Sequence, residues 1–221
     1  MKLLELKKEN NEYIRFFVKR FPLDQLEEIL KTHVENERYE FIKKEITEVV
    51  GMYFFIKKFL KDIKTLADCC AGYLLFSNFI ARLHPEIKIY AIDVKELKKE
   101  QKLIFYENVE FLKKDIREIK INVDAAIGIH PCNELSEIII EKFKNSKLIA
   151  LMPCCIGSIN FDNWKRNNFE YFFLSNITNE YIAWSYYLAK KLEAQNRKVL
   201  VKRDYKILSE RNILIAGVRQ F

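Results

Sequence analysis

Hydrophobic residues recur at two different spacings along this chain, and the spacing changes near residue 65. Over the first 64 residues, apolar side chains return every three or four positions, as Ile42, Ile46 and Val49 do, which is the spacing of one helix face. Beyond that point, short apolar runs alternate with helical stretches. The pattern predicts a helical N-terminal subdomain over residues 1–64 and a second domain over residues 65–221.

The first domain is predicted to hold three helices. Pro22, with Asp24 just after it, marks a break between the first two. The third continues through residues 52–60, where Phe55 and Phe59 can pack onto the second domain. Basic residues decorate these helices, and they form either a solvated face or a surface that docks a substrate.

The second domain reads as strands that alternate with helices. The predicted strands are residues 65–70, 88–94, 109–115, 123–129 and 147–152, and the predicted helices are residues 74–83, 95–106, 135–143 and 179–195. Such alternation is typical of βαβ units in a mostly parallel sheet. Two last strands, residues 198–207 and 212–218, follow each other too closely for a helical crossover. They must pair antiparallel or lie in different sheets.

Acidic residues end the first two strands of this second domain. Asp68 closes the first apolar run, the chain turns through Cys70, Ala71 and Gly72, and Asp93 closes the second run. In doubly wound α/β domains this order builds a nucleoside crevice at the carboxyl ends of the strands. The turn lets a ligand approach the backbone, and the second acid takes the ribose hydroxyls. Asp93 can alternatively cap the helix that begins after it.

The glycine content of this turn decides which nucleoside fits. A dinucleotide needs a pyrophosphate cradle with three glycines, whereas here only Gly72 is present and the bulky Tyr73 follows. The sequence also has no G-x-x-x-x-G-K-[ST] loop to grip phosphates. A nucleoside with a ribose diol and no phosphate fits better, and S-adenosylmethionine (SAM) is the common one.

Four segments carry a resemblance to a known family. They are Asp68-Cys69-Cys70-Ala71-Gly72, Ile129-His130-Pro131-Cys132-Asn133-Glu134-Leu135, Met152-Pro153-Cys154-Cys155 and Ser209-Glu210-Arg211-Asn212-Ile213-Leu214-Ile215. Together with a parallel sheet that closes with a hairpin, they resemble the class I SAM-dependent methyltransferases. The H-x-C-x-x-L and C-C motifs look like the subgroup that includes the methyltransferase-like proteins. That subgroup is similar to the acceptor-stem tRNA 2′-O-methyltransferases.

The resemblance covers about residues 65–218 and implies the fold and the cofactor. The implied fold is α/β, a Rossmann-like and mostly parallel sheet with a C-terminal antiparallel hairpin. The implied cofactor is SAM, held by Asp68, Cys70, Ala71, Gly72, Asp93 and Asp115. Asp115 matches the position that holds the adenine amino group, although its neighbour Arg117 makes a surface ion pair an alternative. Relatives often carry histidines after Cys155, where this chain has Ile156, Gly157 and Ser158.

Two residues after the fourth strand are candidates for the catalytic side of the pocket. The resemblance places His130 at the edge of the methyl-transfer pocket, beside the cofactor. An imidazole can accept a proton from a nucleophile near neutral pH, but it can equally be a hydrogen-bonded structural group. Asn133 either orients the acceptor with its amide or caps the next helix.

A set of cysteines beside His130 raises the question of a metal. Cys132, Cys154 and Cys155 follow neighbouring strands, so with His130 they offer four nitrogen and sulfur ligands for zinc. The spacing matches no C-x₂-C hairpin, however. The alternative, which we prefer, assigns no metal and treats them as small, polarizable residues close to the cofactor.

Charge and composition suggest an anionic partner. The chain has 221 residues and a net charge of +7, which suits RNA. Residues 158–174 mix aromatic side chains with Lys165 and Arg166, and they form either a base-stacking surface or a lid packed on the core, in both cases beside the crevice. Five cysteines without a readable disulfide framework, and the lack of a long apolar run, predict a cytoplasmic protein without a membrane span.

These observations predict a SAM-dependent methyltransferase that acts on RNA, most plausibly tRNA. The alternatives are a small-molecule or protein acceptor, or a methyltransferase-fold protein that binds RNA or another partner without catalysis.

Overall fold

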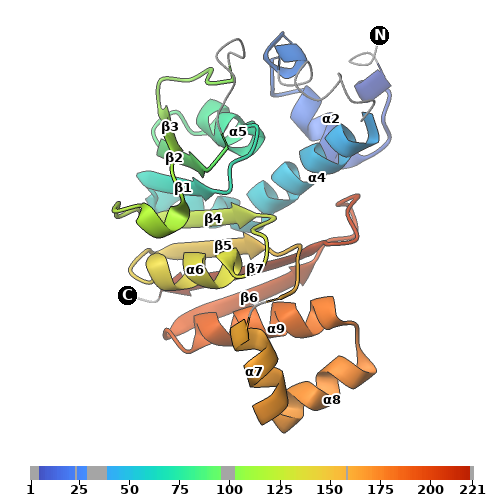
Figure 1. The fold of residues 1–221 in the computed structure, drawn as a ribbon. Helices are drawn as coiled ribbons and strands as arrows, with labels where there is room; N and C mark the ends of the chain where they lie inside the picture. The colour runs from blue at the N-terminus through green and yellow to red at the C-terminus, as the bar shows by residue number, and fades with distance from the viewer. Residues whose placement is uncertain (1–4, 23, 29–38, 96–102, 158, 220–221) are drawn as a thin grey trace.

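The strands, which begin at residue 65, form one seven-stranded sheet with helices on both faces (Figure 1). The computed structural model describes residues 5–22, 24–28, 39–95, 103–157 and 159–219. The strand order is β3-β2-β1-β4-β5-β7-β6. The strands are β1 (Thr65–Cys69), β2 (Lys88–Asp93), β3 (Val109–Lys113), β4 (Ala125–Ile129), β5 (Leu148–Met152), β6 (Arg197–Arg203) and β7 (Ile213–Arg219).

The direction of the strands confirms the predicted fold class. Strands β1 to β5 are parallel to one another, whereas β7 runs antiparallel to both β5 and β6. The last two strands therefore form the antiparallel hairpin, and β7 is inserted between β5 and β6. The order turns around at β1 and β4, so the carboxyl ends of these two strands border the crevice expected for such a sheet.

The helices agree in position with most of the sequence pattern. They are α2 (Glu12–Val18), α4 (Tyr39–Ile56), η1 (Lys57–Asp62), α5 (Leu75–Leu83), η2 (Ile116–Glu118), α6 (Leu135–Lys142), α7 (Ile159–Asn167), α8 (Phe169–Ile177) and α9 (Glu180–Glu193). The helix predicted over 95–106 falls mainly on residues 96–102, which lie outside the described residues, and residues 103–106 are not helical. Among the described residues, no helix is long and apolar enough to cross a membrane.

Two hydrophobic cores lie on opposite faces of the sheet. Side chains of a strand alternate between faces, and in β4 Ala125 and Ile127 join one core while Ala126 joins the other. The first core contains α2, α4 and α5, and the second contains α6 and α9. Because both faces are covered, the central strands β4 and β5 are apolar along their whole length.

The N-terminal helices share the first core with the sheet. The rings of Phe17 in α2 and Phe79 in α5 stack with their centroids 5.0 Å apart. Helix α4 approaches the loop after β6 so closely that a Cβ at Gly51 would lie 2.6 Å from Cδ1 of Ile207. The described N-terminal helices thus pack directly on the sheet, and a domain boundary at residue 64 stays a prediction.

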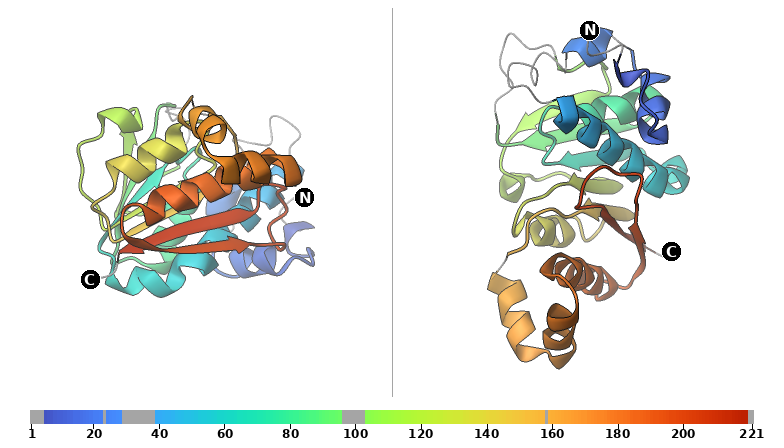
Figure 2. Two further views of the ribbon diagram at one scale, coloured as in Figure 1. Left: turned by 90° about the horizontal axis from the view of Figure 1, so that it is seen from below. Right: turned by 90° about the vertical axis from the view of Figure 1, so that its right-hand side faces the viewer.

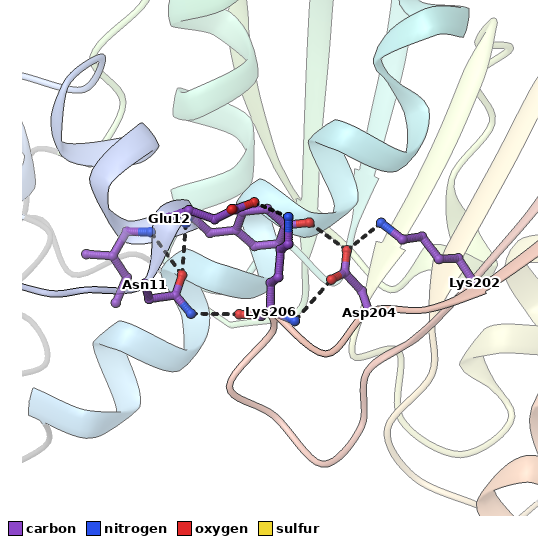
Figure 3. Close-up of polar contacts among 7 residues, drawn as sticks. Asn11, Glu12, Lys202, Asp204 and Lys206 are labelled. Carbon is purple, nitrogen blue, oxygen red and sulfur yellow. Dashed lines mark hydrogen bonds and ion pairs between the residues drawn. The ribbon is translucent and has the colours of Figure 1, made fainter.

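A buried polar cluster ties α2 to the loop after β6 (Figure 3). The hydroxyl of Tyr13 donates a hydrogen bond of 2.6 Å to Oδ2 of Asp204, and Lys202 Nζ lies 2.8 Å from the same oxygen. The Lys206 amide donates to Oδ1 of Asp204, and Asn11 donates to the Lys206 carbonyl. Burial alone would raise the pKa of Asp204, but its bonds from Lys202, Tyr13 and the Lys206 amide lower it below the ordinary value.

The aromatic-rich segment after β5 forms α7 and α8, which pack on α9. Phe161 and Tyr171 are buried, and the rings of Phe161 and Trp184 meet edge to face with centroids 5.1 Å apart. Figure 2 shows these helices beyond α9, at the end of the molecule opposite the N-terminal helices. Of the two predictions for this segment, the lid packed on the core is therefore the correct one for the rings of Phe161 and Tyr171, which are not available for stacking on bases.

We predict that Tyr13→Phe destabilises the whole fold, because it leaves a buried carboxylate with one bond fewer. Loss of a hydrogen bond to a charged group costs roughly 1.5–3 kcal/mol. The measurement is the free energy of unfolding from urea denaturation. The control is Tyr205→Phe, which removes a hydroxyl from a side chain that is 77% exposed. Equal stability of the two variants would contradict the role of the cluster.

Candidate functional site

The turn between β1 and α5 has an unusual backbone. Cys70, Gly72 and Leu74 all have positive φ angles, of 66°, 52° and 63°. Such angles are costly for residues with a side chain, so the turn must be held by its surroundings. Its amides are held from β2: the Ala71 amide donates to the Ile92 carbonyl at 3.0 Å, and the Gly72 amide donates to Oδ2 of Asp93 at 2.9 Å.

This turn borders a cavity of about 770 Å³ at the carboxyl ends of the strands. All the residues that the sequence predicted for the site line it: Asp68, Cys70, Ala71, Gly72, Asp93, Asp115, His130 and Asn133. Helix α4 supplies a further wall through Phe41, Lys44, Glu45 and Glu48. The volume lies in the range of small-molecule and cofactor sites.

Asp68 is buried at the base of the cavity. Its Oδ2 accepts a hydrogen bond of 2.6 Å from the Ser77 hydroxyl, on the first turns of α5. Burial raises the pKa of Asp68 to about 7, against an opposing effect of the Ser77 bond and with a smaller contribution from the charge of Asp93. A ligand with positive charge would favour the ionised form of this carboxyl group.

Asp93 has a partner on each carboxylate oxygen. Besides the Gly72 bond to Oδ2, the Lys95 amide donates to Oδ1 at 2.9 Å, a contact of the kind that starts a helix. Each oxygen retains a second acceptor position. The helix that Asp93 would cap lies outside the described residues, so the cap and the ribose contact both stay predictions.

Asp115 lies on the cavity wall and pairs with Arg117. It accepts from the backbone amide of Arg117 at 2.8 Å and from its Nη1 at 2.7 Å. The backbone bond above all, and then the guanidinium, lower the pKa of Asp115. The ion-pair alternative is thus present in the structure, and a contact with adenine stays a prediction.

His130 faces a glutamate from the N-terminal helices. Its Nε2 lies 2.7 Å from Oε1 of Glu48, whose side chain is buried. Both ring nitrogens of His130 and Oε1 of Glu48 are buried and have no hydrogen-bond partner among the described residues, so the contact is a short approach without hydrogen-bond geometry. A carboxylate beside one ring nitrogen favours a proton there, which leaves the other nitrogen as an acceptor.

Sequence reasoning missed the glutamates of α4. The signal was available, because Phe41, Glu45 and Glu48 recur at helical spacing and so share one face of the helix. Burial, followed by the charge of Glu48, raises the pKa of Glu45 to about 8, so this group stays largely protonated at neutral pH. The sequence pattern could not predict that the face of α4 with these glutamates points toward His130.

Asn133 lines the cavity but does not cap α6. The cap position is occupied by Glu134, and Asn133 has a left-handed backbone with φ of 49°. The capping alternative for Asn133 was therefore wrong. Its role toward an acceptor stays a prediction.

Three of the four residues considered as zinc ligands meet at one point. The sulfur atoms of Cys132, Cys154 and Cys155 lie 3.4–3.7 Å from one another. His130 is not part of this group, because its Nε2 lies against Glu48. Burial above all raises the pKa of the thiols of Cys132 and Cys154.

The segment from α7 to α8 does not reach the cavity. No described residue between 159 and 177 lines it. The prediction that this segment lies beside the crevice was wrong, since α7 and α8 continue past the sheet to pack on α9. Lys165 within it pairs with Asp162 and Glu180.

Comparison with known proteins gives a family. Residues 38–161, more than half of the chain, match the family model described as a methyltransferase domain. The chain belongs to this family. The matched residues contain the whole of α4 and therefore include the glutamates as well as the turn after β1. No curated protein matches the sequence of this methyltransferase domain.

Several solved methyltransferases are similar to the chain at low identity. Magnesium protoporphyrin IX methyltransferase from Synechocystis PCC 6803, with bound SAH, is 14% identical over 80% of this chain and 83% of its own, with a TM-score of 0.49. Human N-acetylserotonin methyltransferase with SAM is 14% identical over 99% of this chain and 66% of its own, also at 0.49. The Methanococcus jannaschii fibrillarin pre-rRNA processing protein is 14% identical over 76% and 75%, again at 0.49.

The family match confirms the predicted enzyme class. The chain is a methyltransferase of the SAM-dependent type, with the Rossmann-like sheet and the hairpin that the sequence predicted.

We predict that Asp68 makes the stability of the protein fall as the pH rises from about 4 to about 7. Its folded pKa lies above its unfolded value, so the folded state binds the proton more tightly and loses that advantage as the proton leaves. About three pKa units correspond to roughly 4 kcal/mol. Asp68→Asn should have a shallower slope, to which the raised pKa of Glu45 still contributes, as measured by urea unfolding at a series of pH values.

The control for this series is Asp62→Asn, whose side chain is 71% exposed. It should follow the pH dependence of the unchanged protein. Parallel curves for the unchanged protein and Asp68→Asn would show that the buried carboxyl group does not titrate as its surroundings require.

Proposed function

We propose that this chain methylates RNA with SAM bound in the cavity at the carboxyl ends of β1, β2 and β4. The observation that carries the RNA assignment is a group of lysines on the cavity wall. Lys44, Lys95 and Lys114 line the cavity and form no ion pair with any described residue. Cations without an acidic partner at the mouth of a site suit the phosphates of a polyanionic acceptor.

The turn after β1 fits the cofactor. A Cβ built at Gly72 would meet nothing within 4 Å, so the backbone there borders open space. Asp93 would accept from the ribose hydroxyls, and Asp115 would lie toward the adenine. Asp68 would oppose the positive charge of the methionine part. Bound SAM supplies an electrophilic methyl group, and the protein has only to place an acceptor in line with it.

Glu48 and His130 fit the removal of a proton from the acceptor. The carboxylate of Glu48 lies beside Nε2 of His130 and would favour a proton there, and Nδ1 would then accept the proton of the reacting hydroxyl or amine. Glu48 acts through His130 and is therefore a positioning residue. Protonated Glu45 beside it adds no second negative charge at neutral pH.

We predict that Asp93→Ala and Glu48→Gln separate cofactor binding from proton removal. Asp93→Ala should lower SAM affinity by at least about 10-fold, because it removes charge-assisted hydrogen bonds. Glu48→Gln should leave SAM affinity unchanged and reduce the rate of transfer by about 100-fold, within the usual contribution of a general base. Isothermal titration measures the first effect and single-turnover transfer the second.

Two results would count against these roles. If Asp93→Ala binds SAM as tightly as the unchanged protein, Asp93 does not hold the ribose. If Glu48→Gln transfers methyl groups at the original rate at every pH, His130 needs no orienting carboxylate.

We predict that labelled SAM transfers its methyl group to cellular RNA, with the label in the tRNA size fraction. RNA binding should weaken steeply as the salt concentration rises. Lys95→Ala and Lys114→Ala should each reduce, by about one, the slope of the logarithm of the binding constant against the logarithm of the salt concentration. The control is Lys198→Ala, an exposed lysine in β6 at the opposite edge of the sheet. Label in a small-molecule fraction, with a flat salt response, would replace RNA by a small acceptor.

A further inference from the structure

Three cysteine sulfurs form a triangle at the mouth of the cavity. The distances are 3.7 Å from Cys132 to Cys154, 3.7 Å from Cys132 to Cys155 and 3.4 Å from Cys154 to Cys155. No other group of three or more histidine, cysteine or acidic residues among those described brings its ligand atoms together in this way. Three thiols facing one point is an arrangement that packing alone does not require.

The triangle has the dimensions of one face of a zinc–thiolate tetrahedron. With zinc–sulfur bonds of about 2.3 Å, two sulfurs of a regular tetrahedron stand about 3.8 Å apart. The observed separations are within a few tenths of an ångström of that length. A metal ion could therefore bind all three sulfurs with small rotations of the side chains.

The loops after β4 and β5 explain how neighbouring cysteines can point the same way. In a strand, Cys154 and Cys155 would face opposite sides of the sheet. They instead follow Pro153, after β5 has ended at Met152, so the alternation no longer applies. Cys132 follows Pro131 in the same manner, and the His130 amide donates to the Met152 carbonyl at 2.9 Å, which holds the two loops side by side.

A disulfide explains the cluster less well. All five cysteines of the chain are free thiols in the structure, and a disulfide between any two of the three would leave the third beside it without a partner. The distances between the sulfur atoms are also much longer than the sulfur–sulfur bond of a disulfide, which is about 2.05 Å. Three equivalent thiols suit a metal that takes three sulfur ligands.

We propose that Cys132, Cys154 and Cys155 bind one zinc ion as three thiolates, with the fourth position open toward the cavity. Cys132 and Cys154 line the same cavity as Asp93 and His130, so a water molecule or an atom of the acceptor can complete the tetrahedron. Binding replaces the thiol protons, which are released to solvent, and no electron is transferred. This site does not depend on the acceptor being RNA.

The test measures metal on the intact chain. Protein purified under reducing conditions and loaded with zinc should retain one equivalent after removal of free metal. Cobalt in its place should give the intense near-ultraviolet sulfur-to-cobalt charge-transfer band and the visible bands of a tetrahedral site. Cys132→Ser, Cys154→Ser and Cys155→Ser should each weaken zinc binding by more than about 100-fold, since loss of an outer partner alone costs 10- to 100-fold.

The matched control is Cys70→Ser, which changes a cysteine on the wall of the same cavity that is not one of the three. It should retain the metal and the cobalt spectrum. Absence of retained metal and of the cobalt charge-transfer band in the unchanged protein would overturn the proposal, even if a cysteine variant failed to fold. Thiol titration of the denatured protein that finds two thiols missing would assign a disulfide instead.

Titration with SAM on the same samples distinguishes this proposal from the proposed function. If the protein binds zinc but not SAM, the metal site is supported and the proposed function is refuted. If it binds SAM but not zinc, the proposed cofactor site is supported and the metal site is refuted.

Discussion

The burial of α4 against the sheet is the constraint on which the site depends. Its apolar face, with Ile46 and Val50 fully buried, gains stability only when it is removed from water. The close approach at Gly51 fixes the distance between the helix and the loop after β6. When α4 packs in this way, its second face places Glu45 and Glu48 in the cavity wall. Removing these carboxyl groups from water has an unfavourable desolvation energy.

That cost is reduced by the partners that the sheet provides. Glu48 meets His130, and burial keeps Glu45 in its neutral form. On the other side of the cavity, Asp68 is buried beside Ser77, and Asp93 is bonded to two backbone amides. The cavity therefore concentrates acidic groups from the helices and from the strand ends, and its outer wall carries the lysines. Such a distribution suits a positively charged cofactor inside and an anionic acceptor outside.

Backbone strain gathers in the same place. Among the residues that the structure describes, five other than glycine have positive φ angles, and three of them, Cys70, His130 and Asn133, line the cavity. Strained conformations persist where the surrounding structure holds them, and here the hydrogen bonds between the turns and the neighbouring strands do so. The strand ends are thus rigid supports for their side chains.

Much of the fold could be read from local patterns. The β1–α5–β2 unit is predicted within a residue or two of its observed bounds, because the apolar run, the turn residues and the amphipathic helix lie next to each other in the chain. The packing of residues 158–174 was harder to predict from the sequence. Their aromatic side chains fit a base-stacking surface as well as a packed one, and only the contact with Trp184 of α9 decides for Phe161.

The sequence by itself determined the kind of sheet, the acids at the ends of its strands and the class of enzyme, since each depends on periodicity and short motifs. The tertiary structure alone decided that Glu48 meets His130, across 82 positions of the chain, and that three cysteines from two loops face one another without that histidine. Local sequence carries the preference of a residue for helix, strand or turn. It does not carry the direction in which a buried face points, because that is set by packing against elements far away in the chain.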